Sequence, residues 1–153
     1  MSDSAIEILL VEDDPKDAKL TLRELQRENL NNRIVVARDG EEALDFLFCR
    51  GAFSDRLLSR PPKLVLLDLK LPKVDGLTVL REIKSQDVTR PIPVVVMTSS
   101  GEERDIVESY KLGVNSYIQK PMDFEKFRQT IKTLGLYWLI TSRLPPDRTF
   151  TRE

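Results

Sequence analysis

The feature that most constrains the fold of this chain is a set of short, uninterrupted apolar runs, most of which lead directly into polar residues. A strand with one face exposed to solvent alternates apolar and polar residues, whereas these runs are apolar nearly throughout. Such strands are typical of a parallel sheet that is covered by helices on both faces. The predicted strands span residues 6–11, 33–37, 63–68, 92–98 and 116–119.

Segments with the apolar spacing of helices separate these runs. Pro15 suits the first turn of the first helix, and Gly113 suits the position just after the fourth. Asp75 and Asp123 suit N-terminal caps. We therefore predict a doubly wound α/β fold, (βα)5, with a five-stranded parallel sheet in the order 2-1-3-4-5. The predicted helices span residues 15–29, 40–51, 76–85, 102–113 and 123–140.

Composition excludes several kinds of chemistry. The 153 residues include no histidine and one cysteine, Cys49, which excludes histidine-based triads, most zinc sites and an intrachain disulfide. The net charge of −1 gives no general attraction to nucleic acid or membranes. We find no signal peptide and no membrane-spanning run, and we expect a cytoplasmic protein with Cys49 buried. One domain is expected over residues 1–140, with a C-terminal tail over 141–153.

Polar residues gather where the predicted strands end. In parallel α/β sheets, ligands bind at the carboxyl ends of the strands, near the point where the strand order reverses. Residues 12–14 are all acidic and follow the first strand, and Asp68 ends the third. Thr98 ends the fourth strand and Lys120 follows the fifth. We expect the acids to share one pocket, with Thr98 and Lys120 on its far wall.

Several carboxylates in one pocket repel each other, so one of them must be protonated or a cation must bind. Mg²⁺ fits well, because it prefers one or two carboxylates together with water and phosphate oxygens. Asp68 would then be a nucleophile for a phosphoryl group. Each residue also has a plainer interpretation: Asp14 or Thr98 could cap a helix, Lys120 could be a surface lysine, and Tyr117 could simply pack.

The stretches "ILLVEDDP", "LVLLDLKLPKVDG", "VVVMTSS" and "YIQKP" occur in an order that resembles the receiver domains of two-component response regulators. The resemblance covers roughly residues 5–140 and implies a flavodoxin/receiver-like fold. It implies that Asp68 is the phosphoacceptor of a signalling protein that assists its own phosphorylation and dephosphorylation but is not a conventional enzyme. Asp13, Asp68 and the backbone carbonyl of Lys70 would bind Mg²⁺, and Glu12 would act through water.

The resemblance also assigns the remaining residues of the site. Thr98 would hydrogen-bond a phosphoryl oxygen, Lys120 would pair with the phosphoryl group, and the Lys120–Pro121 peptide bond would be cis. Tyr117 would be a rotameric switch coupled to Thr98. Phosphorylation would then reshape the face formed by the fourth helix, the fifth strand and the fifth helix.

Four further features resemble the single-domain regulators that partner bacterial phytochrome histidine kinases. They are "DGEEALDFLF", the long loop at 52–62, "DLKLPKVDGL" and "LGLYWL". We expect output through protein contacts or phosphate relay, since the remaining tail is too short for a DNA-binding domain.

The end of the last predicted helix is apolar on all sides, notably at Leu136, Tyr137 and Trp138. A helix with one buried face does not need this, so we predict a homodimer through this helix and the adjoining face, although packing within the chain is an alternative.

Other functions fit less well. A nucleotide-binding loop after the first strand would be rich in glycine, whereas "EDDPKD" has none. A phosphohydrolase with an aspartate nucleophile would place its D-x-D pair after the first strand, whereas here Asp68 follows the third strand and residue 70 is Lys. A pseudo-receiver that only docks partners remains the alternative.

Overall fold

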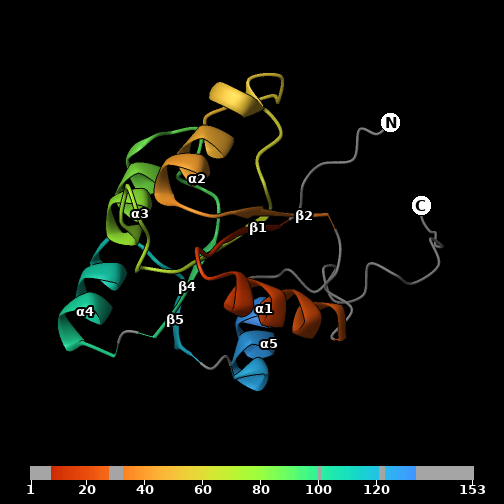
Figure 1. Ribbon diagram of the computed structural model, residues 1–153. Helices are drawn as coiled ribbons and strands as arrows, with labels where there is room; N and C mark the ends of the chain where they lie inside the picture. The colour runs from red at the N-terminus through yellow and green to blue at the C-terminus, as the bar shows by residue number, and fades with distance from the viewer. Residues whose placement is uncertain (1–7, 28–32, 100, 121–122, 134–153) are drawn as a thin grey trace, which may run out of the picture.

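The computed structural model of the protein describes residues 8–27, 33–99, 101–120 and 123–133. Its centre is a five-stranded sheet in which all neighbouring strands are parallel, in the order β2-β1-β3-β4-β5. The predicted fold and strand order are therefore confirmed (Figure 1). The strands are β1 (Ile8–Val11), β2 (Ile34–Ala37), β3 (Leu64–Leu67), β4 (Val94–Thr98) and β5 (Ser116–Gln119).

Helices cover both faces of the sheet. α1 and α5 lie side by side on one face, and α2, α3 and α4 cover the other (Figure 1). A short 3-10 helix, η1, follows α2. The bounds are α1 (Pro15–Arg27), α2 (Gly40–Leu47), η1 (Gly51–Phe53), α3 (Gly76–Ser85), α4 (Glu103–Lys111) and α5 (Phe124–Thr133).

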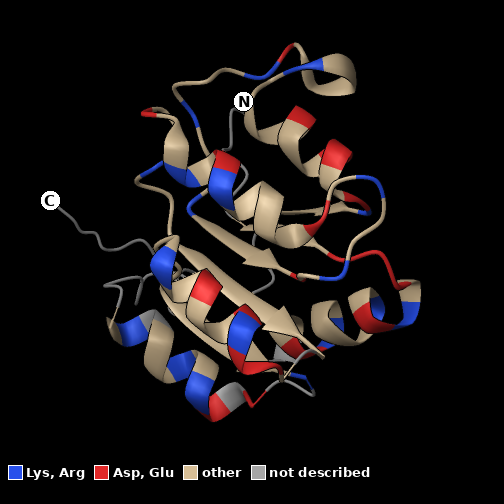
Figure 2. Ribbon diagram, turned by 90° about the vertical axis from the view of Figure 1, so that its left-hand side faces the viewer, with Lys and Arg blue, Asp and Glu red and all other residues tan. Residues whose placement is uncertain are grey.

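Two separate cores explain why the strands are apolar throughout. Leu9 and Val11 of β1 pack in the core on the side of α2 and α3, whereas Ile8 and Leu10 pack in the core on the side of α1 and α5. Successive residues of a strand point to opposite faces, so a sheet covered on both faces buries every one of them. All four residues of β1 are fully buried. Figure 2 shows the result: charged residues lie on helices and loops, and the central strands carry none.

The predicted helix signals have the expected roles. Asp75 Oδ1 accepts a hydrogen bond from the Thr78 amide at 2.8 Å, which caps α3. Asp123 Oδ1 accepts from the amides of Glu125 at 3.0 Å and Lys126 at 3.2 Å, in the first turn of α5. Gly113 follows α4 with a φ of +98°, a conformation that glycine adopts without a steric cost.

The second helix is shorter than the predicted range of 40–51. It ends at Leu47, and the chain turns through residues with positive φ at Cys49 (56°) and Gly51 (56°). The sequence "FLFC" continues the apolar character of the helix, so the pattern alone predicts a longer helix than the one that forms. The prediction that Cys49 is buried is also wrong, because its exposure is intermediate and its Sγ lies 3.6 Å from Arg56 Nη1.

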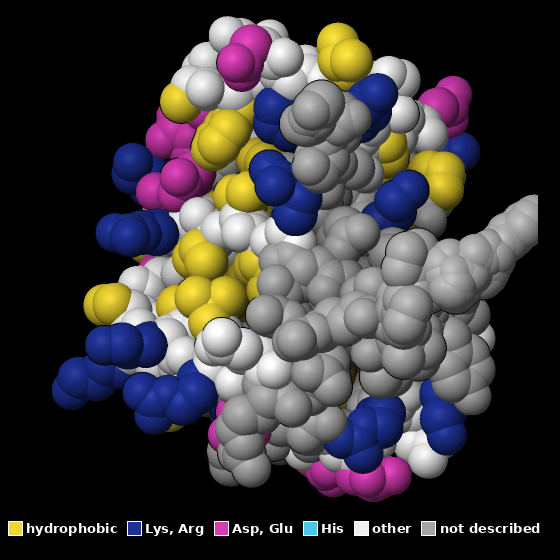
Figure 3. All heavy atoms as spheres, turned by 90° about the vertical axis from the view of Figure 1, so that its right-hand side faces the viewer, with side chains coloured by type: hydrophobic (Ala, Val, Ile, Leu, Met, Phe, Trp, Pro, Cys, Tyr) yellow, Lys and Arg dark blue, Asp and Glu magenta, His cyan; other side chains and the backbone are white. Residues whose placement is uncertain are grey.

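The surface mixes charged and apolar side chains. On the face drawn in Figure 3, Lys and Arg side chains lie among hydrophobic ones.

Within the described ranges, none of the helices combines the length and apolar character that crossing a membrane requires. Leu136, Tyr137, Trp138, the Lys120–Pro121 bond and the tail lie outside the described residues.

Ser109 offers a test of the packing of α4. Its side chain is fully buried, and within the described part of the chain its Oγ has no hydrogen-bond partner. A buried hydroxyl without a partner is costly, and alanine is a better helix former than serine. We expect Ser109→Ala to raise the free energy of unfolding by about 1 kcal/mol, measured by urea denaturation. A loss of stability would mean that this hydroxyl has a partner.

Candidate functional site

Sheet register brings the acids of β1 and β3 together. Val11 and Leu67 are paired at the ends of these adjacent strands, so the next residues, Glu12 and Asp68, leave the sheet side by side. The amide of Asp68 donates to the carbonyl of Val11 at 3.0 Å, and the amide of Glu12 donates to the carbonyl of Ala37 at 2.9 Å. The backbone on either side of the site is thus fixed by strand pairing.

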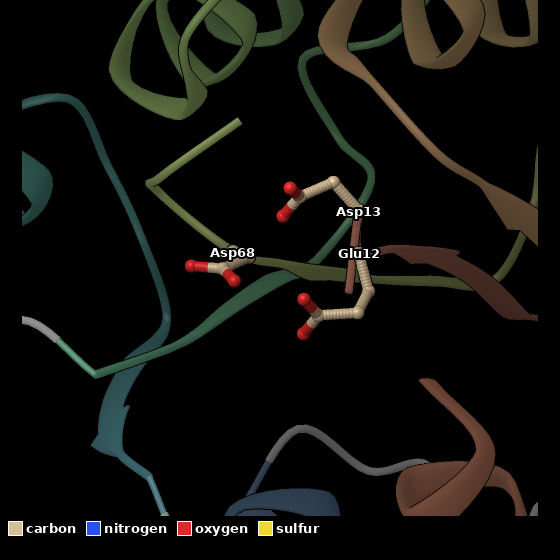
Figure 4. Close-up of side chains that lie close together, drawn as sticks. All are labelled: Glu12, Asp13 and Asp68. Atoms are coloured by element: carbon tan, nitrogen blue, oxygen red, sulfur yellow. The ribbon is translucent and has the colours of Figure 1, made fainter. Parts of the chain in front are cut away.

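Three carboxylates form an acidic cluster, which we define as Glu12, Asp13 and Asp68. One oxygen from each lies within 4.8 Å of the others. Figure 4 shows Glu12 and Asp13 projecting from the end of β1 toward the Asp68 carboxylate. Glu12 is 1% exposed and Asp68 5% exposed, while Asp13 is exposed to solvent. The cluster therefore has a buried floor and one side open to water.

Lys120 makes direct contact with Glu12 and Asp68 instead of facing them across a pocket. Its Nζ donates to Glu12 Oε1, to Asp68 Oδ2 at 3.0 Å and to Asp17 Oδ2 at 3.0 Å. Its side chain is only 17% exposed, so the interpretation of Lys120 as a surface lysine is wrong. Burial lowers the pKa of this ammonium group, but the three carboxylates outweigh burial and raise it, so Lys120 is charged at neutral pH.

The surroundings of Glu12 raise the pKa of its carboxyl group well above the ordinary value. Burial is the main cause that raises its pKa, and the neighbouring Asp68 charge adds to it, while hydrogen bonds from Lys120 and the Asp14 amide oppose the rise. The result is a pKa of about 7, compared with an ordinary 4.5. Burial is therefore the main reason, and repulsion from Asp68 a smaller one, that Glu12 holds its proton to a higher pH than an ordinary glutamate does.

The backbone behind Asp68 is closely packed against α3. A Cβ atom on Gly76 would lie 2.4 Å from the Asp68 carbonyl oxygen and from Leu69 Cα, a distance that only glycine avoids. The Gly76 amide donates to the Leu69 carbonyl at 2.9 Å. On the other side, the Lys70 amide donates to Asp68 Oδ1 at 3.1 Å, and the Lys70 side chain is exposed. Asp68 is therefore held by its own loop and by the start of α3.

Thr98 and Tyr117 lie on the neighbouring strands. Thr98 ends β4, is fully buried, and accepts a hydrogen bond from the Lys120 amide to its carbonyl at 2.7 Å. It does not cap α4, whose N-cap is Glu102. Tyr117 pairs with Val96 and packs, 6% exposed, in the core beside α2 and α3. Thr98 is thus linked to Lys120 through the backbone, and Tyr117 is a buried core residue in this state.

Two aspartates at the start of α1, Asp14 and Asp17, have separate roles. Asp14 Oδ1 accepts from the Lys16 amide at 2.9 Å and its carbonyl accepts from Ala18, so Asp14 caps α1 as its plainer interpretation had it. Asp17 is the contact that sequence reasoning missed. Its only signal is its place in the first turn of a helix that begins directly at the site.

The acidic cluster fits a hard divalent cation. Its three donors are carboxylate oxygens that already lie within 4.8 Å of one another, and one of them is exposed to the water that Mg²⁺ retains. A soft metal would favour sulfur or imidazole ligands, which this set lacks. Glu12, Asp13 and Asp68 are therefore the residues that would hold such an ion.

Comparison with known proteins finds similar sequences and solved structures. Residues 8–132 match the family model of the response regulator receiver domain. The chain is 52% identical to the solved bacteriophytochrome response regulator AtBRR, covering 88% of this chain and 96% of that one with a TM-score of 0.78. It is 40% identical to the solved phosphorylated cyanobacterial phytochrome response regulator RcpA, covering 93% and 99% with a TM-score of 0.69.

Curated relatives broaden this class. Over 138 residues the chain is 44% identical to the probable methanogenesis regulatory protein FilR2 of Methanothrix harundinacea (strain 6Ac), covering 90% of this chain and 86% of the relative. It is 39% identical to the response regulator Rcp1 of Synechocystis sp., covering 90% and 92%. The Mn²⁺-bound form of Rcp1 has been solved and matches 94% of this chain with a TM-score of 0.70.

Proposed function

The chain belongs to the response regulator receiver domain family, and on that premise we propose that it is a single-domain response regulator that accepts a phosphoryl group on Asp68. Family members are phosphoacceptor signalling modules that bind a divalent metal. The observation that carries the assignment to Asp68 is its position: it lies in the acidic cluster and within 3.0 Å of the Lys120 ammonium group. The alternative is a pseudo-receiver that docks partners without being phosphorylated.

The site supports transfer from a phosphohistidine of a kinase. A lone pair of an Asp68 carboxylate oxygen forms the new O–P bond as the P–N bond breaks, and the departing imidazole keeps the bonding electron pair and then takes a proton from water. Mg²⁺ in the acidic cluster would neutralise charge on the phosphoryl oxygens. Lys120 would supply the second positive charge, and Thr98 a hydrogen bond to a phosphoryl oxygen. Lys70 would contribute its backbone carbonyl to the metal.

Metal dependence tests this function. We expect the protein incubated with a small-molecule phosphodonor and Mg²⁺ to gain the mass of one phosphoryl group, and to gain nothing when EDTA replaces Mg²⁺. Manganese should substitute, in keeping with the Mn²⁺-bound form of its relative Rcp1. The mass of the intact protein is measured by mass spectrometry. An unmodified mass in the presence of Mg²⁺ would support the pseudo-receiver.

We further propose that the donor is a histidine kinase of the phytochrome class, acting in the cytoplasm. The support is the similarity to AtBRR, a bacteriophytochrome response regulator, and to RcpA, a cyanobacterial phytochrome response regulator. The probable methanogenesis regulatory protein FilR2 has comparable sequence identity to this chain, so the kinase class needs its own test. Phosphoryl transfer from a purified bacteriophytochrome should be faster than from an unrelated histidine kinase; equal rates would contradict this assignment.

Output would pass through the α4–β5–α5 face. Phosphorylation of Asp68 would draw Thr98 inward and let Tyr117 change rotamer, which would reshape that face. Tyr117 belongs to β5, one of the elements of that face, and its side chain is buried in the core behind it. The protein would also assist the loss of its own phosphoryl group, since the metal and Lys120 that favour transfer also favour hydrolysis.

The same face would form a homodimer. Its support among the described residues is α4, where Val107 is 45% exposed and Tyr110 49% exposed. We expect Leu136→Ala combined with Trp138→Ala to shift the protein toward a monomer, because these substitutions remove apolar contact area from the last predicted helix. Sedimentation velocity measures this. A wild-type protein that already sediments as a monomer at high concentration would contradict the dimer.

A further inference from the structure

The ammonium group of Lys120 has no hydrogen-bond donor to spare. It carries three N–H donors, and three carboxylates lie within hydrogen-bond distance of Nζ. Glu12 follows β1, Asp68 follows β3, and Asp17 lies in the first turn of α1. A phosphoryl group that arrives on Asp68 therefore needs a donor that is already in use.

The three acceptors differ in how easily they release Lys120. Glu12 and Asp68 have side chains that are 1% and 7% exposed, and both belong to the acidic cluster. Asp17 is 39% exposed and lies outside that cluster. Water can replace the ammonium group at an exposed carboxylate at little cost, whereas a buried carboxylate that loses its partner is strongly destabilised. Asp17 is therefore the acceptor that the site gives up first.

We propose that Asp17 is a positioning residue that competes with the phosphoryl group for Lys120. In the unphosphorylated state its carboxylate occupies one Lys120 donor, and that donor turns to the phosphoryl oxygens when Asp68 is modified. This inference rests on the proposed function, since it assigns Asp17 a role in the same phosphoryl site. It goes further by assigning to α1 a residue that sets how tightly the site holds its anion.

Removing the Asp17 charge should strengthen anion binding. Lys120 would keep Glu12 and Asp68 as acceptors, so it would stay in place, and the phosphoryl group would no longer compete with a third carboxylate. A partly exposed ion pair contributes little, so the expected gain is about threefold in affinity. A role for Asp17 in folding alone would lower stability and would not raise affinity for an anion.

The test measures binding of beryllium trifluoride, a reversible mimic of the phosphoryl group, to the full chain at saturating Mg²⁺ by ¹⁹F NMR. We expect Asp17→Asn to bind it about threefold more tightly than wild type, and Asp17→Glu, which restores the charge, to match wild type. Asp14→Asn is the charge-matched control, because it removes one charge at the same end of α1 while asparagine keeps the cap. Its affinity should equal that of wild type.

Two results would overturn the inference in distinguishable ways. If wild type binds the mimic and Asp17→Asn binds it no more tightly than Asp14→Asn does, Asp17 does not compete for Lys120 and the proposed function stands. If wild type with saturating Mg²⁺ binds no mimic at all, the proposed phosphoacceptor function fails and the role of Asp17 fails with it. Titration of Mg²⁺ alone, by calorimetry, should give the same affinity for Asp17→Asn and Asp14→Asn.

Discussion

Asp68→Asn should leave the fold intact and abolish phosphoryl uptake. An amide has no anionic oxygen to attack phosphorus, so no other change at this position removes the chemistry with so little change in shape. The amide oxygen can still accept from the Lys70 amide or from Lys120, which keeps the loop in place. We expect intact mass spectrometry to find no phosphorylated species after incubation with Mg²⁺ and phosphodonor, whereas wild type becomes modified.

The matched control is Asp87→Asn, the same change at an exposed aspartate that pairs only with nearby Arg90 at 2.9 Å in the contacts described for it. This variant should be phosphorylated like wild type. Urea unfolding should show that Asp68→Asn is folded, and at least as stable as wild type without metal, because one charge of the acidic cluster is gone. Phosphorylation of a folded Asp68→Asn variant would place the acceptor elsewhere.

Lys120→Met should produce the largest loss of stability among the site variants. Methionine fills a similar volume but leaves Glu12, Asp17 and Asp68 to repel each other without their shared cation. Removing one partner of a buried ion pair costs about 3–5 kcal/mol, and we expect about 3 kcal/mol here, since Asp17 can turn to water. The measurement is urea denaturation at pH 8 in EDTA, with the exposed Lys63→Met as control.

The same variant has a predictable pH dependence. The pKa of Glu12 is about 7 in the folded protein, and without Lys120 it rises further because an attraction that lowers it is gone. At pH 6 Glu12 is therefore largely protonated in both proteins, and the loss of its ion pair matters less. The difference in unfolding free energy should be smaller at pH 6 than at pH 8, and Mg²⁺ should restore part of it. A difference that grows toward pH 6 would show that Glu12 is not the destabilised group.

The fold was largely predictable because local signals and packing agree. Strands such as β1 are apolar at every position, and the two cores use every one of those positions. Asp75 and Gly113 mark helix ends through contacts within a few residues of themselves. The end of α2 was not predictable, because "FLFC" keeps helix character while the turn depends on the backbone at Cys49. Local sequence contains no information on that conformation.

The site was predictable as a set of strand ends but not as a network. Asp68 and Glu12 could be placed together because strand order alone makes β1 and β3 neighbours. The contact of Lys120 with Asp17 joins residues 103 positions apart. It depends on where the first turn of α1 lies relative to the carboxyl ends of the strands, and no periodicity or motif in the sequence predicts that placement. The shared use of Lys120 by three carboxylates therefore emerges only from the structure.

The central claim is that Asp68 is the phosphoacceptor, and locating the acyl phosphate tests it most directly. Borohydride reduces an aspartyl phosphate to homoserine, which marks the modified residue permanently. Wild type should be incubated with Mg²⁺ and phosphodonor, reduced, digested and sequenced by tandem mass spectrometry. We predict homoserine at position 68 and its absence when EDTA replaces Mg²⁺. Homoserine at another aspartate, or unmodified Asp68 throughout, would contradict the account.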